Sequence, residues 1–178
     1  MSNTPLEGRT ALVTGASRNI GRQIALDLAS AGAAVVVNGV TDQQAADTVA
    51  AEIKDHGGRA IAHLAEVTDR TAVDVMVARA TEELGPVTVL VCNASARGQV
   101  PFLEMTHAQF RRVVDISLDG AFHLSQACLP AMVDAGLGRR IRRSGDYGKL
   151  RRAGSHRYGA PGLSRHLAGD TCCHPDGP

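Results

Sequence analysis

The chain has 178 residues and a formal net charge of +1, values that suit one soluble domain, but the charge is unevenly distributed. Residues 1–137 hold 10 Lys and Arg against 15 Asp and Glu, a net of −5, whereas residues 138–178 hold 9 against 3, a net of +6. Large aliphatic side chains become scarce after Gly138. We therefore expect residues 1–137 to form the folded domain and residues 138–178 to be a poorly ordered basic segment.

Composition excludes several classes of protein. No apolar run approaches the roughly 18 residues of a membrane-spanning helix. Residues 1–8 lack the basic and apolar regions of a secretory signal, and the four cysteines have no framework spacing, which predicts a reducing, cytoplasmic location. Tryptophan is absent and aromatic residues make up 3% of the chain, so a base-stacking surface for nucleic acid is not expected.

Short β-branched runs alternate with longer stretches of helical periodicity in residues 1–137. The runs are 11–13, 34–37, 59–64 and 87–91, and the helical stretches are 20–31, 42–56, 69–84 and 107–135. This alternation predicts βαβ units with a parallel sheet, an α/β doubly wound fold of the Rossmann-like type. The continuous apolar runs 35–37 and 89–91 predict strands that are buried on both faces.

Local signals mark where these elements begin and end. The candidate helix N-caps are Thr41 or Asp42, Thr68 or Asp69, and Thr106. The glycines placed to form a left-handed helix C-terminus are Gly32, Gly57 and Gly85.

A glycine turn follows the first predicted strand. Residues 14–21 read Thr-Gly-Ala-Ser-Arg-Asn-Ile-Gly and lead into a helix, an arrangement that places backbone N–H groups and the positive helix end against a diphosphate. Gly15 permits the tight turn, and Gly21 allows the helix to pack closely on the strand. A plain βα turn with incidental glycines is the alternative, but the position in the first βα unit favours nucleotide binding.

Several motifs in order resemble those of one known family. Residues 14–21 fit the pattern TGxxxGxG, with Asn19 at the middle glycine, and asparagine tolerates a left-handed backbone. Glu66 and Val67 stand at an Asp-Val position, residues 93–95 resemble an Asn-Ala-Gly motif, and residues 110–120 resemble a long central helix. This set resembles the short-chain dehydrogenase/reductase family over about residues 6–137, with a general similarity to 3-oxoacyl-thioester reductases. The Rossmann-like fold would then be incomplete at its C-terminal side, as in a truncated member.

The resemblance implies a nicotinamide cofactor. In the family the Asp-Val position touches the adenine ring. The expected cofactor-binding residues are Gly15, Ser17, Arg18, Asn19, Ile20, Gly21, Asn38, Glu66, Val67, Asn93 and Ala94. The second strand ends at 37–40 without a carboxylate for a ribose 2′-hydroxyl, and Arg18 lies where NADP-preferring members often have a basic residue. We predict NADP(H) rather than NAD(H); a solvated surface arginine is the alternative for Arg18.

The resemblance also implies a catalytic set for reducing a carbonyl or oxidising a secondary alcohol. The family uses a tyrosine as proton donor, a lysine four residues later, a serine about thirteen residues earlier and an asparagine on the central helix. The candidates for tyrosine, serine and asparagine are Tyr158, Ser144 and Ser117. Gly162 stands at the lysine position, and Gly145 rather than Ser144 has the expected spacing. Each proton-transfer group contributes about 10²–10⁴ in rate, so we expect little activity.

Other interpretations of this set remain open. Tyr147 and Arg151 have helical i,i+4 spacing, although the glycines around them do not favour a helix. Both tyrosines could equally be ordinary loop residues. The chain would then be a catalytically inactive nucleotide-binding remnant, which is the alternative to a small-molecule oxidoreductase.

The basic segment 138–178 replaces an expected apolar strand. Four arginines surround Ile141, and burying them in a sheet would carry a large desolvation cost. An out-of-frame reading of GC-rich coding DNA is one explanation, and the coding sequence tests it. A nucleic-acid-binding tail lacks a docking motif, and a metal site is disfavoured because adjacent cysteines are an unusual ligand spacing; its ligands would be His166, Cys172, Cys173 and His174.

Two further expectations complete the interpretation. We expect Cys92, in a strand, and Cys128, in a helix, to be buried as small hydrophobic residues. In the family the central helix packs between subunits, so the resemblance implies a homo-oligomer.

Overall fold

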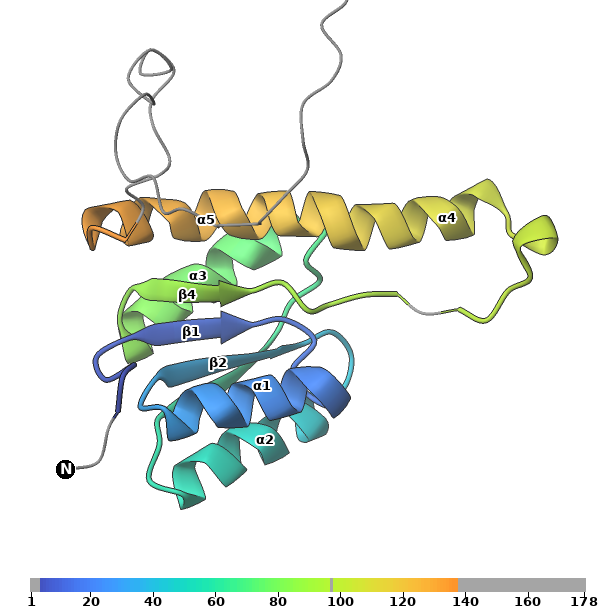
Figure 1. Cartoon of the computed structure of the whole chain (residues 1–178). Coiled ribbons are helices and arrows are strands. Elements are labelled where there is room, and N and C mark those ends of the chain that lie inside the picture. The colour runs from blue at the N-terminus through green and yellow to red at the C-terminus, as the bar shows by residue number, and fades with distance from the viewer. Residues whose placement is uncertain (1–3, 97, 138–178) are drawn as a thin grey trace, which may run out of the picture. The chain divides into compact units, whose positions relative to one another are not determined.

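The structure, a computed structural model, describes residues 4–96 and 98–137 (Figure 1). Its elements in chain order are β1 (Thr10–Val13), α1 (Asn19–Ser30), β2 (Ala34–Gly39), α2 (Gln43–Asp55), β3 (Ala60–Leu64), α3 (Arg70–Leu84), β4 (Val87–Val91), a 3₁₀ turn (Phe102–Glu104), α4 (His107–Val114), a π-helical turn (Asp115–Asp119) and α5 (Gly120–Asp134). The predictions for Ser144, Tyr158 and the rest of residues 138–178 lie outside the described residues.

The strands form one parallel sheet in the order β3-β2-β1-β4. Helices α1 and α2 cover one face, and α3 and α5 cover the other (Figure 1). Alternate strand residues supply the two cores: Val13 and Val35 lie in the first, and Leu12 and Val36 in the second. This arrangement confirms the predicted α/β doubly wound fold.

The predicted helix signals are confirmed. The side chains of Asp42 and Asp69 accept backbone N–H bonds at the starts of α2 and α3, and Thr106 forms a capping box with Gln109 at the start of α4. Gly32, Gly57 and Gly85, which follow helix ends, have φ angles of 99°, 82° and 102°. No helix among the described residues combines the length and the apolar character needed to span a bilayer.

Strand β4 differs from the prediction of burial on both faces. Val35, Val36 and Val37 of β2 are fully buried, whereas residues 89–91 of β4 are only partly buried. Strand β4 is one of the two edge strands of the described sheet and is paired only with β1 there. An edge strand lacks a neighbouring strand on one side, which leaves it more exposed. The apolar run 89–91 does not by itself distinguish an edge strand from a central one. The prediction for Cys92 is also wrong, since this residue, next after β4, is exposed, while Cys128 on α5 is buried.

The stretch predicted as one helix over 107–135 contains a π-helical turn between α4 and α5. Gly120 follows this turn and lies so close to β3's end that an added Cβ would lie 2.7 Å from Val67 Cγ2. Helix α5 packs on the sheet, whereas α4 has no buried residue and extends beyond the sheet (Figure 1). The π-helical turn and the start of α5 therefore border the loop that follows β3.

Candidate cofactor site

A cavity of about 560 Å³ opens where the carboxyl ends of the strands meet their following loops. Ten of the eleven predicted cofactor residues line it: Gly15, Ser17, Arg18, Asn19, Ile20, Gly21, Glu66, Val67, Asn93 and Ala94. Crevices at this edge of an open α/β sheet are where such folds bind ligands. The motifs that the sequence places far apart therefore meet around one space.

The glycine turn is held by very close backbone contacts. A Cβ added to Gly21 would lie 2.2 Å from the carbonyl oxygen of Gly15 and 2.5 Å from Nδ2 of Asn93. Gly15 has φ +61° and Asn19 has φ +50°, so both adopt the left-handed conformation. Asn19 thus takes the backbone shape that its position at the middle glycine predicts.

Asn93 binds the turn from the loop that follows β4. Its Nδ2 donates to the carbonyl oxygens of Thr14 at 2.9 Å and Gly15 at 3.2 Å. The backbone N–H groups of Asn93 and Ala94 donate to Thr14 Oγ1 at 3.0 and 3.1 Å. These bonds fix the β1–α1 turn against the loop after β4, so Asn93 shapes the cavity wall as well as lining it.

Asn38 is the predicted cofactor residue that does not line the cavity. It is fully buried, and its Nδ2 donates to the carbonyl oxygens of Gly39, His63 and Ala65 at 3.0, 3.3 and 3.1 Å. Its Oδ1 accepts the N–H of Gly15 at 3.4 Å. Asn38 therefore links the glycine turn to β3 and the residues after it through hydrogen bonds. Its place at a strand end did not predict this role.

Helix α1 begins differently from the capped helices. Its N-cap residue, Arg18, makes no side-chain cap hydrogen bond, whereas α2, α3 and α4 are each capped by a side chain. The first backbone N–H groups of a helix have no partner within the helix. Here they belong to cavity-lining residues, Asn19, Ile20 and Gly21. The residues present therefore fit an anionic group such as a cofactor diphosphate.

Charged side chains stand around the same cavity. Arg18 and Asp42 both line it, and the Asp42 carboxylate accepts the N–H of Ala45 at 2.9 Å as the cap of α2. Glu66, just beyond β3, lies 3.8 Å from Arg112 of α4. The sequence predicts Asp42 only as a helix cap and carries no signal for Arg112 as a cavity residue. The ion pair between Arg112 and Glu66 links residues 46 positions apart, and no local sequence pattern predicts such a contact.

The catalytic predictions are not assembled within the described residues. Ser117 lies on the π-helical turn and is exposed, and it is not among the residues that line the cavity, whereas its buried neighbour Ile116 is. Ser144 and Tyr158 lie outside the described residues. The described residues therefore contain the cavity lined by the predicted cofactor residues but no assembled catalytic set, and the three catalytic assignments stay predictions.

Known proteins are similar to this chain in sequence and in fold. The sequence model of the family described as short chain dehydrogenase matches residues 9–162. The chain belongs to the short-chain dehydrogenase family. The match continues past residue 137, where the charge changes sign, and includes Ser144 and Tyr158. Members of this family bind NAD(H) or NADP(H) and act as oxidoreductases.

Curated relatives include three dehydrogenases or reductases. The chain is 39% identical to 7α-hydroxysteroid dehydrogenase of Escherichia coli strain K12, over 76% of this chain and 52% of the relative. It is 37% identical to the 3-oxoacyl-[acyl-carrier-protein] reductase of a Synechocystis strain, over 88% and 64%. It is 39% identical to cis-4-hydroxycyclohexanecarboxylate dehydrogenase of Sinomonas cyclohexanicum, over 85% and 61%. The chain thus spans only about half to two thirds of these relatives.

Solved structures agree with this family. A crystal structure of hydroxysteroid dehydrogenase from Escherichia coli matches with a TM-score of 0.70 and 38% identity, over 76% of this chain and 57% of that one. A structure of 7α-hydroxysteroid dehydrogenase complexed with NADH and 7-oxo glycochenodeoxycholic acid also matches with a TM-score of 0.70 and 38% identity, over 76% and 52%. The Rossmann-like fold predicted from the sequence is confirmed.

Proposed function

We propose that this chain is an NADP(H)-dependent oxidoreductase that reduces a small-molecule carbonyl or oxidises a secondary alcohol. The observation that carries the proposal is the uncapped start of α1 over the glycine turn, at the wall of a 560 Å³ cavity. Ser17, Asn19 and Ile20 would hold the diphosphate there, and Glu66 and Val67 would meet the adenine. When bound, the nicotinamide would supply or accept the hydride.

Charge in the cavity supports NADP(H) over NAD(H). The 2′-phosphate that distinguishes the two cofactors favours a cation and disfavours a free carboxylate. Arg18 is exposed and lines the cavity, and no bond engages its guanidinium among the described residues. The carboxylate of Asp42 is engaged by the first turn of α2. Arg18 is therefore the residue that we assign to coenzyme choice.

Titration of the two reduced cofactors tests this choice. We expect NADPH to bind more tightly than NADH, and Arg18→Gln to weaken NADPH about tenfold while leaving NADH nearly unchanged, because only the phosphate contact is lost. Lys54→Gln is the matched control, since it removes an exposed positive charge that does not line the cavity. Tighter binding of NADH by the wild-type protein would overturn the NADP(H) assignment.

A second candidate function is nucleotide binding without turnover. It is favoured by Gly162, which stands four residues after Tyr158 where the family's lysine is expected, and by Ser117, which is outside the cavity wall. Oxidation of NADPH by a simple diketone discriminates the two functions. Turnover supports the oxidoreductase; binding without turnover supports the remnant.

The remaining parts of the proposal concern the whole protein. We also propose that the protein is cytoplasmic, that its folded domain ends at residue 137 and that it assembles into a homo-oligomer. The substrate of the chain is proposed only as a carbonyl or alcohol compound, since the chain spans part of the length of its relatives.

A further inference from the structure

One ion pair stands in the cavity wall. Oε2 of Glu66, in the loop after β3, lies 3.8 Å from Nη2 of Arg112 on α4, and both residues line the cavity. The side chain of Glu66 is 30% exposed and that of Arg112 is 67% exposed. Such a solvated pair contributes little to stability. Its place in the wall is therefore more informative than its strength.

The neighbouring arginine of α4 is engaged differently. Arg111 forms ion pairs with Asp115 and, at 3.8 Å, with Asp119, both farther along the same long helix. Arg112 instead reaches a residue of another element. Helix α4 has no buried residue and extends beyond the sheet (Figure 1). The Arg112–Glu66 pair thus joins this protruding helix to the loop at the adenine end of the proposed site.

The length of the Glu66 side chain makes the position of its carboxylate depend on a partner. The aligned position in the family carries aspartate, and glutamate has one more rotatable bond, so its carboxylate loses more conformational freedom when it is fixed. A carboxylate has two oxygens and accepts several hydrogen bonds. One oxygen can face Arg112 while the other accepts a hydrogen from a ligand in the cavity.

We propose that Arg112 is a positioning residue for the adenine end of the cofactor: its guanidinium holds the Glu66 carboxylate where it accepts a hydrogen from the exocyclic amine of adenine. This inference rests on the proposed function and deepens it. A purine that carries a carbonyl in place of the amine turns lone pairs instead of a hydrogen toward the carboxylate, and its nearest N–H is on the adjacent ring nitrogen, N1. The pair therefore selects an amine-bearing base over a carbonyl-bearing one.

The test compares NADPH with its reduced hypoxanthine analogue, in which the amine is replaced by a carbonyl. The quantity measured is the ratio of the two dissociation constants, obtained by fluorescence titration of the full chain. We expect the wild-type protein to bind NADPH about tenfold more tightly, since a charged hydrogen bond is lost in the analogue. Glu66→Gln should bring the ratio close to one, because an amide both accepts and donates.

Arg112→Ala should lower the ratio to about threefold, and Arg112→Lys, which keeps the positive charge, should restore most of it. Arg111→Ala is the matched control on the same helix and should leave the ratio unchanged. An Arg112→Ala protein that keeps the wild-type ratio, or that weakens both cofactors equally, would overturn this inference. So would a wild-type ratio of one.

Failure of the proposed function has a different signature. If neither NADPH nor NADH binds to the folded wild-type protein, the nucleotide site itself is wrong and the inference falls with it. If NADPH binds but the base ratio does not respond to Arg112, only the positioning role is wrong. Where NADH is the tighter ligand, the same comparison is made with its hypoxanthine analogue.

Discussion

Gly21 lies where the first helix leaves the sheet and has no room for a side chain. A Cβ there would lie 2.2 Å from the backbone oxygen of Gly15 and 2.5 Å from the amide nitrogen of Asn93. Neither group is the end of a flexible chain, because Asn93 is held by its own bonds to the turn. We expect Gly21→Ala to cost about 3 kcal/mol of unfolding free energy, measured by urea denaturation, and to abolish NADPH binding.

Gly57 provides the matched control for Gly21. It has φ +82°, but an added Cβ would meet nothing within 4 Å. Gly57→Ala should therefore cost only the strain of the left-handed backbone, about 1 kcal/mol, and should leave NADPH binding intact. Equal costs for the two variants would mean that the close approach at Gly21 is relieved by movement of the turn.

At the residue scale, the site residues that could be predicted from the sequence are those whose backbone conformation restricts the residue type. Gly15, Asn19 and Gly21 are recognisable because a turn of this shape restricts which residues fit. Side-chain contacts between residues that are distant in the sequence could not be predicted. Asn38 bonds three carbonyl groups from below the site, and Arg112 meets Glu66 from a helix far along the chain. Both contacts depend on tertiary packing, which periodicity does not encode.

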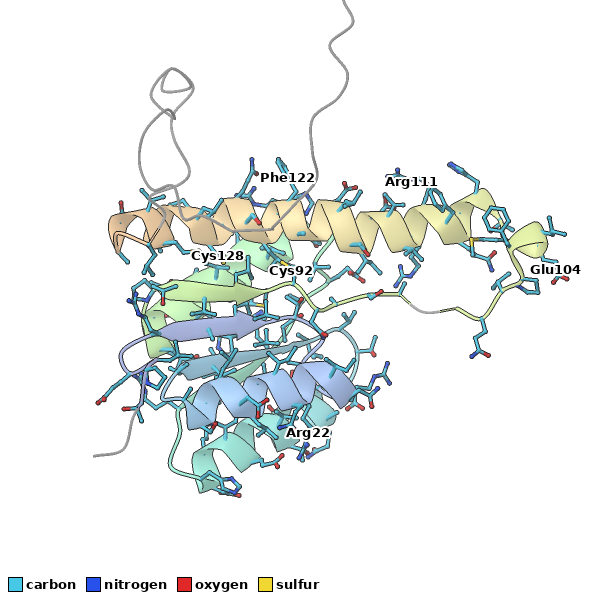
Figure 2. The ribbon with its side chains drawn as sticks, in the orientation of Figure 1. Arg22, Cys92, Glu104, Arg111, Phe122 and Cys128 are labelled. Carbon is cyan, nitrogen blue, oxygen red and sulfur yellow. The ribbon has the colours of Figure 1, made fainter. Side chains whose placement is uncertain are left out.

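At the scale of the elements, α5 packs on the sheet near β4 through its buried side. Figure 2 shows Cys128 and Cys92 in this region. Burial raises the pKa of the Cys128 thiol to about 12, assisted by Cys92, and partial desolvation raises the pKa of Cys92, whose surface is otherwise exposed. Because the folded pKa of Cys128 lies above its unfolded value, its contribution to stability is present below about pH 9 and is lost as pH rises toward 12.

The rate of alkylation of Cys128 tests whether α5 stays packed on the sheet. The thiolate is the reactive form, so at pH 8 we expect iodoacetamide to label Cys92 slowly and Cys128 hardly at all in the folded protein. Peptide mass mapping separates these two sites from Cys172 and Cys173. In urea both sites should label at the rate of a free thiol. Native labelling of Cys128 as fast as that of Cys92 would show that α5 does not stay packed on the sheet.

The helices and strands themselves were largely predictable. The four strands and helices α1 to α3 begin and end within two residues of their predicted ranges, and the range 107–135 matches the start of α4 and the end of α5, because caps and glycines mark most of these ends. The partial exposure of β4 and the π-helical turn at Asp115–Asp119 were not predicted. The first depends on which strands are neighbours, and the second lies directly before Gly120, where the helix approaches Val67 of the loop after β3.

At the scale of the molecule, apolar side chains are exposed along the long helix. They are Phe110, Val113, Leu118, Phe122 and Val133. Figure 2 shows Phe122 on the side of α5 that faces away from β4. Scattered apolar residues are normal on a surface, but several on one long helix indicate a contact surface. The covering partner that agrees with the family resemblance is a second copy of this chain, which would present the same residues.

Sedimentation of the full chain tests this assembly. We expect the wild-type protein to sediment as a dimer or larger at micromolar concentration, and Phe122→Lys to shift it toward monomer, because a charge would be desolvated at the contact. Phe122 is 58% exposed, so the substitution should not unfold the domain. Val75→Lys is the control, since Val75 is 55% exposed on α3 rather than on the long helix. A monomeric wild-type protein, or equal dissociation of both variants, would contradict a contact through α4 and α5.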